Sequence, residues 1–165
     1  MERLKKNPIK KVGEILAREQ ASPDERHRAL EELSLWREAH LAPFQSMLSI
    51  LEKAARDANI DFVLFGRLKR IDTIEGKLRR PGHTYKLNTM NDIAGCRLIL
   101  PSIDALRAAA STLKSNLGPA LYDTDDYLIR PQKSGYRGIH LISRFDSPDY
   151  GLERLRVETQ LRTDI

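Results

Sequence analysis

The sequence predicts an α/β (α+β) fold in which helices flank a mixed sheet of about five strands. Residues up to about 60 carry apolar side chains at helical spacing, whereas later residues alternate short β-branched or aromatic runs with helical stretches. The chain has 165 residues, enough for one domain with a hydrophobic core. We therefore expect a single domain over 1–165, with a helical part at 1–59 and a sheet region at 60–165.

The composition is that of a folded, well-solvated protein, with 41% hydrophobic and 31% charged residues. A net charge of +5 favours anionic partners such as nucleotides, nucleic acid or an acidic membrane face, without choosing among them. The single cysteine, Cys96, excludes an intrachain disulfide and a thiolate zinc cluster. The charged N-terminus lacks the apolar segment of a secretory signal, and no run of about 18 apolar residues is present to span a membrane. We therefore expect a cytoplasmic protein without a membrane partner.

The helical part contains start and stop signals for two helices. Residues 1 to about 11 are basic, and we expect them to be mobile. Ser22 and Glu25 form the two ends of a capping box that begins a helix. Apolar residues then recur at helical spacing as far as Pro43, which should end or kink this helix. A second helix is expected to continue to about Asp57.

The elements expected after residue 60 follow one another with short connections. In order, they are a buried strand at 62–65 that ends at Gly66, a short helix at 71–78, a strand at 93–100 closed by Pro101, a helix at 102–117 stopped by Gly118 and Pro119, a brief strand at 127–129, a strand at 139–145, a turn at 147–151 and a strand at 155–161. The strands rest on β-branched and aromatic runs, and the helices on apolar residues at helical spacing.

A stripe of polar residues follows the first of these strands. Its members fall at i, i+4, i+8 and i+11, so they share one face of a helix, and they are Lys69, Thr73, Lys77 and Arg80. Three of the four are cationic, and a triphosphate needs such a stripe because its charges must be neutralised along its length. The alternative is an ordinary solvated basic face, which is common on amphipathic helices.

Asp92 stands at the head of an otherwise apolar strand, where it is well placed to bind a metal ion at the edge of the sheet. Magnesium commonly uses one or two carboxylates together with substrate phosphates. Arg97 lies five residues further on, so in a regular strand it points to the opposite face unless Gly95 introduces a bulge. The alternative is a capping Asp and a surface Arg.

Two further segments have the composition of a binding site. In the loop at 133–140, glycines frame Tyr136, so that the backbone can approach a ligand and the ring can stack on a base; the alternative is a plain turn. In the segment 156–162, alternation gives one face without apolar residues, which is either a ligand-binding floor or a solvated surface; its side chains are Arg156, Glu158, Gln160 and Arg162. On a floor, Asp92 and Glu158 are candidates for the paired acids of a metal-dependent phosphoryl transfer.

Taken in order, these segments resemble the synthetase domain of the RelA/SpoT family over about residues 60–163. The resemblance is carried by four motifs as a group: Gly66-Arg67-Leu68-Lys69 with Lys77 and Arg80, Asp92-Ile93-Ala94-Gly95-Cys96-Arg97, Gly135-Tyr136-Arg137-Gly138-Ile139-His140, and Val157-Glu158-Thr159-Gln160-Leu161-Arg162-Thr163. It implies a nucleotidyltransferase-like fold. It also implies a GTP pyrophosphokinase that transfers the β,γ-pyrophosphate of ATP to the 3′-hydroxyl of GDP or GTP, with Mg²⁺, to make the guanosine alarmones (p)ppGpp.

The resemblance implies residue roles on the ATP side of such a site. Arg67 and Arg97 would sandwich the adenine of ATP. The ATP phosphates would be held by Lys69, Lys77 and Arg80.

It likewise implies roles at the reacting groups and the acceptor. Asp92 would bind Mg²⁺ with help from Glu158, and Glu158 would orient or deprotonate the 3′-hydroxyl. Tyr136 would stack on the acceptor guanine. The remaining acceptor contacts would come from Lys133, His140 and Gln160.

Some features depart from the family pattern. Gly138 stands where many relatives carry Ser. Separately, no hydrolase motif precedes the synthetase region, so we expect a small stand-alone synthetase that does not degrade alarmone. The chain stops at Ile165, where relatives continue with a helix, so we expect the site to be truncated at this end.

Two other functions stay open at this point. One is a toxin-type relative that uses another acceptor, an adenosine nucleotide or the 3′ end of tRNA. The other is a nucleotide-binding regulator that is catalytically incomplete, although the presence of both Asp92 and Glu158 argues against it. A homo-oligomer is compatible with the resemblance.

Overall fold

The computed structural model describes residues 6–164 of the chain. The helices are α1 (Lys6–Ala17), α2 (Pro23–Ala39), α3 (Leu41–Asp57), α4 (Ile71–Leu78) and α5 (Ile103–Leu117), with 3-10 turns η1 (Leu87–Thr89), η2 (Gly118–Ala120) and η3 (Pro148–Tyr150). The strands are β1 (Val63–Leu68), β2 (Ala94–Leu100), β3 (Leu121–Asp126), β4 (Ile139–Ser147) and β5 (Leu152–Thr163). Among the described residues, no helix is long and apolar enough to cross a membrane.

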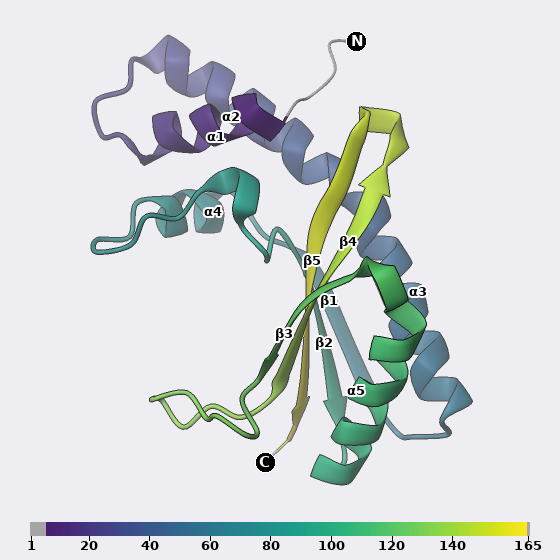
Figure 1. The fold of residues 1–165 in the computed structure, drawn as a ribbon. Coiled ribbons are helices and arrows are strands. Elements are labelled where there is room, and N and C mark those ends of the chain that lie inside the picture. The colour runs from purple at the N-terminus through teal and green to yellow at the C-terminus, as the bar shows by residue number, and fades with distance from the viewer. Residues whose placement is uncertain (1–5, 165) are drawn as a thin grey trace.

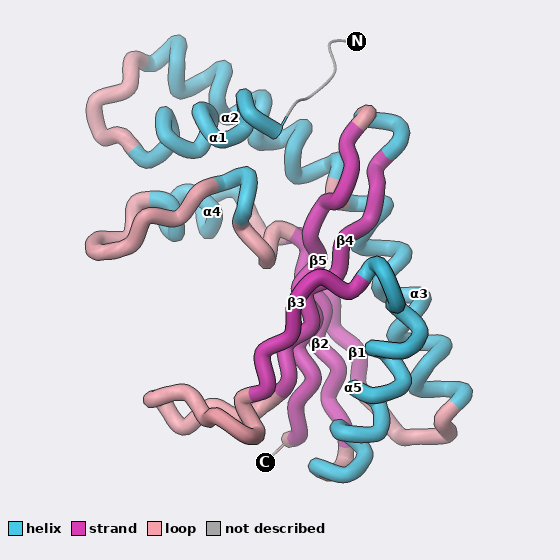
Figure 2. The backbone as a smooth tube through the Cα atoms, viewed as in Figure 1, coloured by secondary structure: helices cyan, strands magenta, loops and turns pink. Residues whose placement is uncertain are grey.

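The strands form a mixed five-stranded sheet in the order β1-β2-β5-β4-β3, which confirms the predicted fold class. The pairing of β2 with β5 is parallel, and the other pairings are antiparallel. Figure 1 shows α3 and α5 together on one face of the sheet, while Figure 2 shows the opposite face turned toward the loops and toward α4. Buried side chains such as Met47, Leu98 and Leu113 fill the layer between the helices and the sheet. The face without these helices is therefore left for a site.

A second hydrophobic cluster joins the N-terminal helices to α4. Ser22 caps α2 through a complete capping box with Glu25, as predicted. The expectation of a mobile N-terminus is wrong from Lys6 onward, because Ile9, Val12 and Leu16 form an apolar stripe of α1 that is buried in this cluster. The part of that expectation that concerns residues 1–5 lies outside the described residues.

Two strand predictions need correction. The first strand is not buried: β1 is at the edge of the sheet, with Val63 50% and Phe65 55% exposed, and it runs past Gly66 because Gly66 still pairs with Cys96. The strand expected at 127–129 is a turn. One carboxylate oxygen of Asp126 accepts hydrogen bonds from the backbone N–H groups of Leu128 and Ile129, at 3.0 and 3.2 Å, and this contact ends the strand β3.

The other predicted elements are confirmed with small shifts at their ends. Helix α2 ends at Ala39, and Pro43 lies in the first turn of α3, which reaches Asp57. Helix α5 is capped by Ser102 and stopped at Gly118, whose φ of 48° only glycine adopts easily. Strands β4 and β5 are longer than expected and are joined through η3.

Candidate active site

The register of the sheet brings the predicted polar residues into two adjacent rows on its open face. In one row, Arg67 pairs with Gly95, and Gly95 pairs with Glu158. In the next, Arg97 pairs with Gln160, and Gln160 pairs with His140. Strands β1, β2, β5 and β4 thus each contribute side chains to one surface, so the interpretation of the fifth strand as a ligand-binding floor has structural support.

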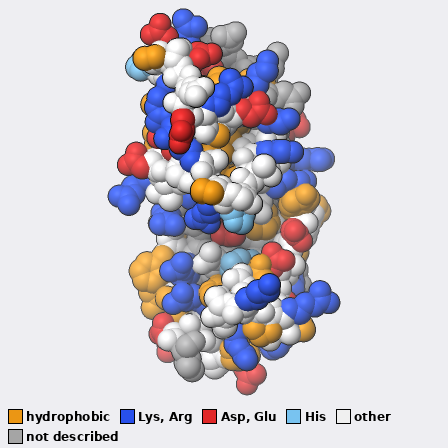
Figure 3. Space-filling model, turned by 90° about the vertical axis from the view of Figure 1, so that its left-hand side faces the viewer, with side chains coloured by type: hydrophobic (Ala, Val, Ile, Leu, Met, Phe, Trp, Pro, Cys, Tyr) orange, Lys and Arg blue, Asp and Glu red, His pale blue; other side chains and the backbone are white. Residues whose placement is uncertain are grey.

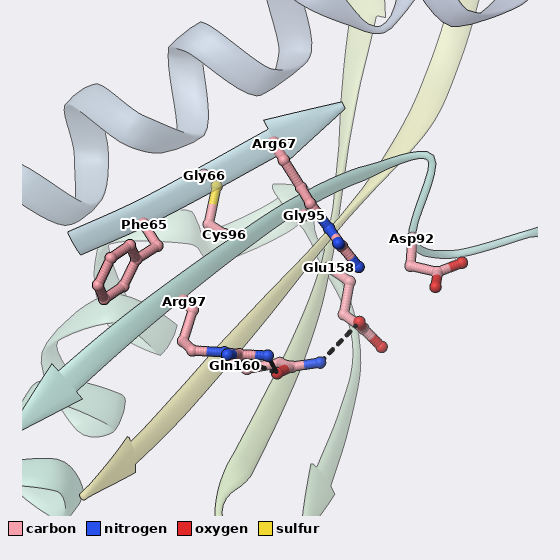
Figure 4. A pocket seen from close by; sticks show the side chains of 9 residues that line it. All are labelled: Phe65, Gly66, Arg67, Asp92, Gly95, Cys96, Arg97, Glu158 and Gln160. Carbon is pink, nitrogen blue, oxygen red and sulfur yellow. Dashed lines mark hydrogen bonds between the residues drawn. The ribbon is translucent and has the colours of Figure 1, made fainter. Parts of the chain in front are cut away.

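A pocket of about 350 Å³ lies over these rows. It is lined by Phe65, Gly66, Arg67, Asp92, Gly95, Cys96, Arg97, Glu158 and Gln160 (Figure 4). The floor is open at Gly95, because a Cβ atom there would meet no other atom within 4 Å. Figure 3 shows a hollow on this side of the molecule, with Lys and Arg side chains gathered above and below it. The pocket therefore combines carboxylates with a cationic rim.

Asp92 is held by two lysines. Lys69 Nζ forms an ion pair with Oδ2 of Asp92, and Lys77 Nζ lies 2.9 Å from Oδ1. Burial by itself raises the pKa of Asp92, but the hydrogen bonds and charges of the two lysines outweigh burial and hold the pKa below its ordinary value. Asp92 is therefore ionised at neutral pH, and it holds both lysine ammonium groups next to the pocket that it lines.

The predicted helical stripe is only partly correct. Lys69 precedes α4 and Arg80 follows it, so the four residues do not share a single helix. Lys69 is buried, its backbone N–H donates to Ile93 O at 2.7 Å, and its ammonium group pairs with Asp92. Arg80 is exposed beyond the end of the helix. The structure thus joins Lys69 and Lys77 by their shared carboxylate rather than by helical periodicity.

Arg97 and Asp92 line the same pocket, contrary to the expected opposite faces. The reason is that Asp92 lies in the segment before β2, so strand alternation does not apply to it. Arg97 donates to Oε1 of Gln160 from Nε at 3.3 Å and from Nη2 at 3.2 Å. The side chain is therefore held over the floor without a bulge at Gly95.

Glu158 lies between two polar neighbours. Its Oε2 accepts a hydrogen bond from Gln160 Nε2 at 3.2 Å, and its Oε1 is 3.6 Å from His140 Nδ1. Burial by itself raises the pKa of Glu158, but the contact with His140 outweighs burial and lowers the pKa below its ordinary value, while the charge of Asp92 acts to raise it. Glu158 is therefore an ionised, partly buried carboxylate that can accept a proton.

The glycine-containing loop places Tyr136 beside this carboxylate. Its hydroxyl lies 3.0 Å from His140 Nε2, and its ring meets the rings of Tyr127 and His140 edge-on. Burial raises the pKa of Tyr136. Lys133 lies in the same loop with its side chain exposed. A line of contacts thus runs from Tyr136 through His140 to Glu158, a connection that the sequence did not predict.

The segments that carry these polar residues also match a family of known proteins. Residues 66–165 match the family described as "Region found in RelA / SpoT proteins". The chain belongs to the RelA/SpoT family. It is 32% identical over 106 residues to the GTP pyrophosphokinase YjbM of Bacillus subtilis and 30% identical over 102 residues to YwaC of the same organism. These matches cover 63% and 59% of the chain, and the chain spans about half the length of the curated relatives it matches, at 50% and 49%.

A solved structure of a GTP pyrophosphokinase family protein from Streptococcus pneumoniae has the same fold, with a TM-score of 0.64 and 25% identity. The match covers 81% of this chain and 70% of that chain. Helix α1 and most of the described N-terminal part precede the residues that match the RelA/SpoT family.

Two residues at the site of this RelA/SpoT family member, and the contacts of a third, were not predicted from the sequence. Phe65 lines the pocket as an exposed ring, Tyr127 contacts the rings of Tyr136 and His140, and Arg156 donates to Thr89 O and to Asn91 Oδ1 at 2.8 and 2.9 Å. Phe65 could have been found from the sequence, because it stands two residues before Arg67 in the same strand and therefore points to the same face. The contacts of Tyr127 and Arg156 join segments that are distant in sequence.

Gly138 is closely packed in this RelA/SpoT family member. A Cβ atom there would lie 2.8 Å from Leu161 O and 2.9 Å from the Tyr136 hydroxyl. We expect Gly138→Ser to lower the free energy of unfolding by about 1–3 kcal/mol, as overpacking does, measured by chemical denaturation. Gly95→Ser is the matched control, because its Cβ meets nothing and stability should change little. Equal stability of Gly138→Ser and the wild type would contradict this account of the packing.

Proposed function

We propose that the chain is a GTP pyrophosphokinase, which transfers the β,γ-pyrophosphate of ATP to the 3′-hydroxyl of GDP or GTP to make (p)ppGpp. The single observation that carries this proposal is the pocket in which Asp92 and Glu158 face a cationic rim on the open side of the sheet. Membership of the RelA/SpoT family and the similarity to two GTP pyrophosphokinases support it.

The donor is assigned to the half of the pocket near β1 and α4. Arg67 and Arg97 come from adjacent strands, and their guanidinium planes suit stacking on a purine. Lys69 and Lys77 are assigned to the ATP phosphates, with Arg80 as an exposed third cation. When ATP enters, its phosphates compete with Asp92 for these lysines, so that part of the cationic charge passes from the carboxylate to the nucleotide.

The carboxylate ligands of the pocket suit Mg²⁺. Asp92 and Glu158 line one pocket, and hard oxygen ligands are those that magnesium prefers. Within residues 6–164, no group of three or more acidic, histidine or cysteine side chains could hold a metal ion, so substrate phosphates would have to complete its coordination. Asp92 and Glu158 are the residues that would hold Mg²⁺, which when bound neutralises the charge that develops on the transferred phosphates.

The acceptor is assigned to the other half, beside Tyr136, with His140, Gln160 and Lys133 as further contacts. Glu158 takes the proton of the 3′-hydroxyl, whose oxygen then attacks the β-phosphorus of ATP. The bond between the β-phosphorus and the oxygen that bridges it to the α-phosphorus breaks, and AMP leaves. The lowered pKa of Glu158 keeps this base ionised at neutral pH, which general-base catalysis requires.

One experiment decides the acceptor. The protein is incubated with Mg²⁺ and ATP labelled in its β-phosphate, together with GDP, GTP, excess unlabelled ATP or deacylated tRNA in separate reactions. We expect label at the 3′ position of GDP or GTP, with AMP in equal amount. Label only on an adenosine nucleotide or on tRNA would assign a different acceptor, and ATP binding without transfer to any of them would assign a nucleotide-binding regulator.

The assignment of Lys77 to ATP can be tested separately. We expect Lys77→Ala to weaken ATP binding by about 10-fold, the low end for a hydrogen bond to a charged group, and to leave GDP binding nearly unchanged. The loss should shrink at high salt because Lys77 is partly exposed. Calorimetry measures both affinities. The control is Lys53→Ala, which removes the same charge from an exposed position on α3 and should have no effect. Unchanged ATP affinity in Lys77→Ala would show that Lys77 is an ordinary solvated side chain without a role in ATP binding.

A further inference from the structure

A second, smaller pocket of about 160 Å³ lies at the junction of α2, η1 and the β4–β5 hairpin. It shares no lining residue with the pocket described above. Three arginines, Arg144, Arg154 and Arg156, line it, and none of its lining residues is acidic. Guanidinium groups gathered in this way repel one another unless an anion lies among them.

Two of the arginines that line this arginine pocket have no acidic partner in the described part of the chain. Arg156 donates to two neutral oxygens, Thr89 O and Asn91 Oδ1. The guanidinium carbon of Arg144 lies 3.2 Å from the ring centroid of Tyr122, so this cation is stacked on an aromatic ring. Among the described residues, no salt bridge to either arginine is formed. Both positive charges are therefore available to an anionic ligand.

Three buried polar atoms around the arginine pocket also have no hydrogen-bond partner within residues 6–164. They are Trp36 Nε1, Arg144 Nε and Asn88 Oδ1, and all three side chains line the cavity. Trp36 is only 2% exposed. A buried donor or acceptor without a partner costs about 1–3 kcal/mol, so such atoms normally contact an ordered water or a ligand. Two of the three are donors, which is what an oxyanion needs.

We propose that the arginine pocket binds free inorganic phosphate. The arginine side chains match its charge and its oxygen geometry, and Asn88 Oδ1 can accept a hydrogen bond from the P–OH group of a protonated phosphate. The volume is too small for a nucleotide, since ligand pockets for molecules of that size span about 300–1,000 Å³. This proposal does not depend on the proposed pyrophosphokinase activity.

The arginine pocket is in contact with the segment that carries Asp92. Arg156 lines the pocket and also donates to Asn91, the residue before Asp92. It lies two residues before Glu158 on the same face of β5. A bound phosphate therefore competes with Thr89 and Asn91 for the hydrogen bonds of Arg156, next in sequence to the segment that carries Asp92.

The protein carries its own reporter for this site. It has a single tryptophan, Trp36, whose indole lines the arginine pocket and does not line the nucleotide pocket, so its fluorescence reports binding in the arginine pocket. Titration with inorganic phosphate, at constant ionic strength, should change this fluorescence with saturation. Arg144→Met should weaken the binding by about 10-fold or more, because a hydrogen bond to a charged group is lost. Arg107→Met on α5 removes an exposed arginine and should have no effect.

Four results would overturn the proposal. Fluorescence that does not respond to phosphate would mean that the cavity holds water and binds no phosphate. Equal responses of Arg144→Met and the wild type would mean that Arg144 does not bind the ligand. Glycerol phosphate binding as tightly as phosphate would exclude the free ion as ligand, and sulfate binding as tightly would exclude the hydrogen bond to Asn88. Arg144→Lys is the second variant if Arg144→Met does not fold. It keeps the charge but loses Nε and the planar fork, so it too should bind more weakly.

Discussion

Replacing Glu158 with Gln should reduce pyrophosphate transfer by at least about 100-fold, the low end of the usual contribution of a general base. The amide keeps the size and one acceptor oxygen of the side chain but cannot take a proton. ATP binding should survive, because Glu158 lies two strands away from Arg67, and the lysines contact Asp92 instead. The measurement is turnover with labelled ATP, relative to a wild-type protein that is active under the same conditions.

The control for this prediction is Glu153→Gln. Glu153 lies on the same strand with its side chain exposed, so the same chemical change there should leave turnover unaffected. The pH dependence gives a second check. Because the pKa of Glu158 is below its ordinary value, the carboxylate should stay active from neutral pH down through mildly acidic pH, and activity should fall only as pH drops through that lowered pKa. Turnover of Glu158→Gln above about a tenth of the wild type would rule out a general-base role.

Replacing Tyr136 with Ala should raise the dissociation constant of the acceptor by about 5- to 150-fold, because base stacking on an aromatic side chain contributes about 1–3 kcal/mol. ATP binding should stay nearly intact. The structure adds a reason to study Tyr136→Phe as well. The Tyr136 hydroxyl contacts His140, which in turn contacts Glu158, so the ring and the hydroxyl serve different neighbours.

The phenylalanine variant separates these roles. If stacking dominates, Tyr136→Phe keeps most of the acceptor affinity, and any loss of turnover comes through His140 and Glu158. The measurement is binding of GDP, GTP, ATP and deacylated tRNA to the wild type and both variants. Stacking tolerates any base, so a preference for guanine has to arise from contacts to its edge. Loss of ATP binding in Tyr136→Ala, with every acceptor unaffected, would reverse the assignment of donor and acceptor halves.

Local patterns in the sequence were sufficient for most elements. The capping box at Ser22 and the glycine stop at Gly118 set helix ends through contacts within a few residues. Strict alternation along β5 placed Glu158 and Gln160 on one face, since successive side chains of a strand point in opposite directions. These rules failed at residues 127–129. There the Asp126 side chain, instead of a neighbouring strand, accepts hydrogen bonds from the backbone, and the segment forms a turn.

The sequence by itself therefore determined the helices from α2 onward, the central strands, the polar floor and the family, but not α1. Only the tertiary structure decided which residues meet: Lys69 and Lys77 converge on Asp92 from 23 and 15 residues away, and β1 lies at the edge with Phe65 exposed. It also assembled the arginine pocket from α2, η1, β4 and β5. The physical reason is that periodicity reports the orientation of neighbouring residues, whereas strand order and helix packing, which no single segment encodes, set the distances between segments.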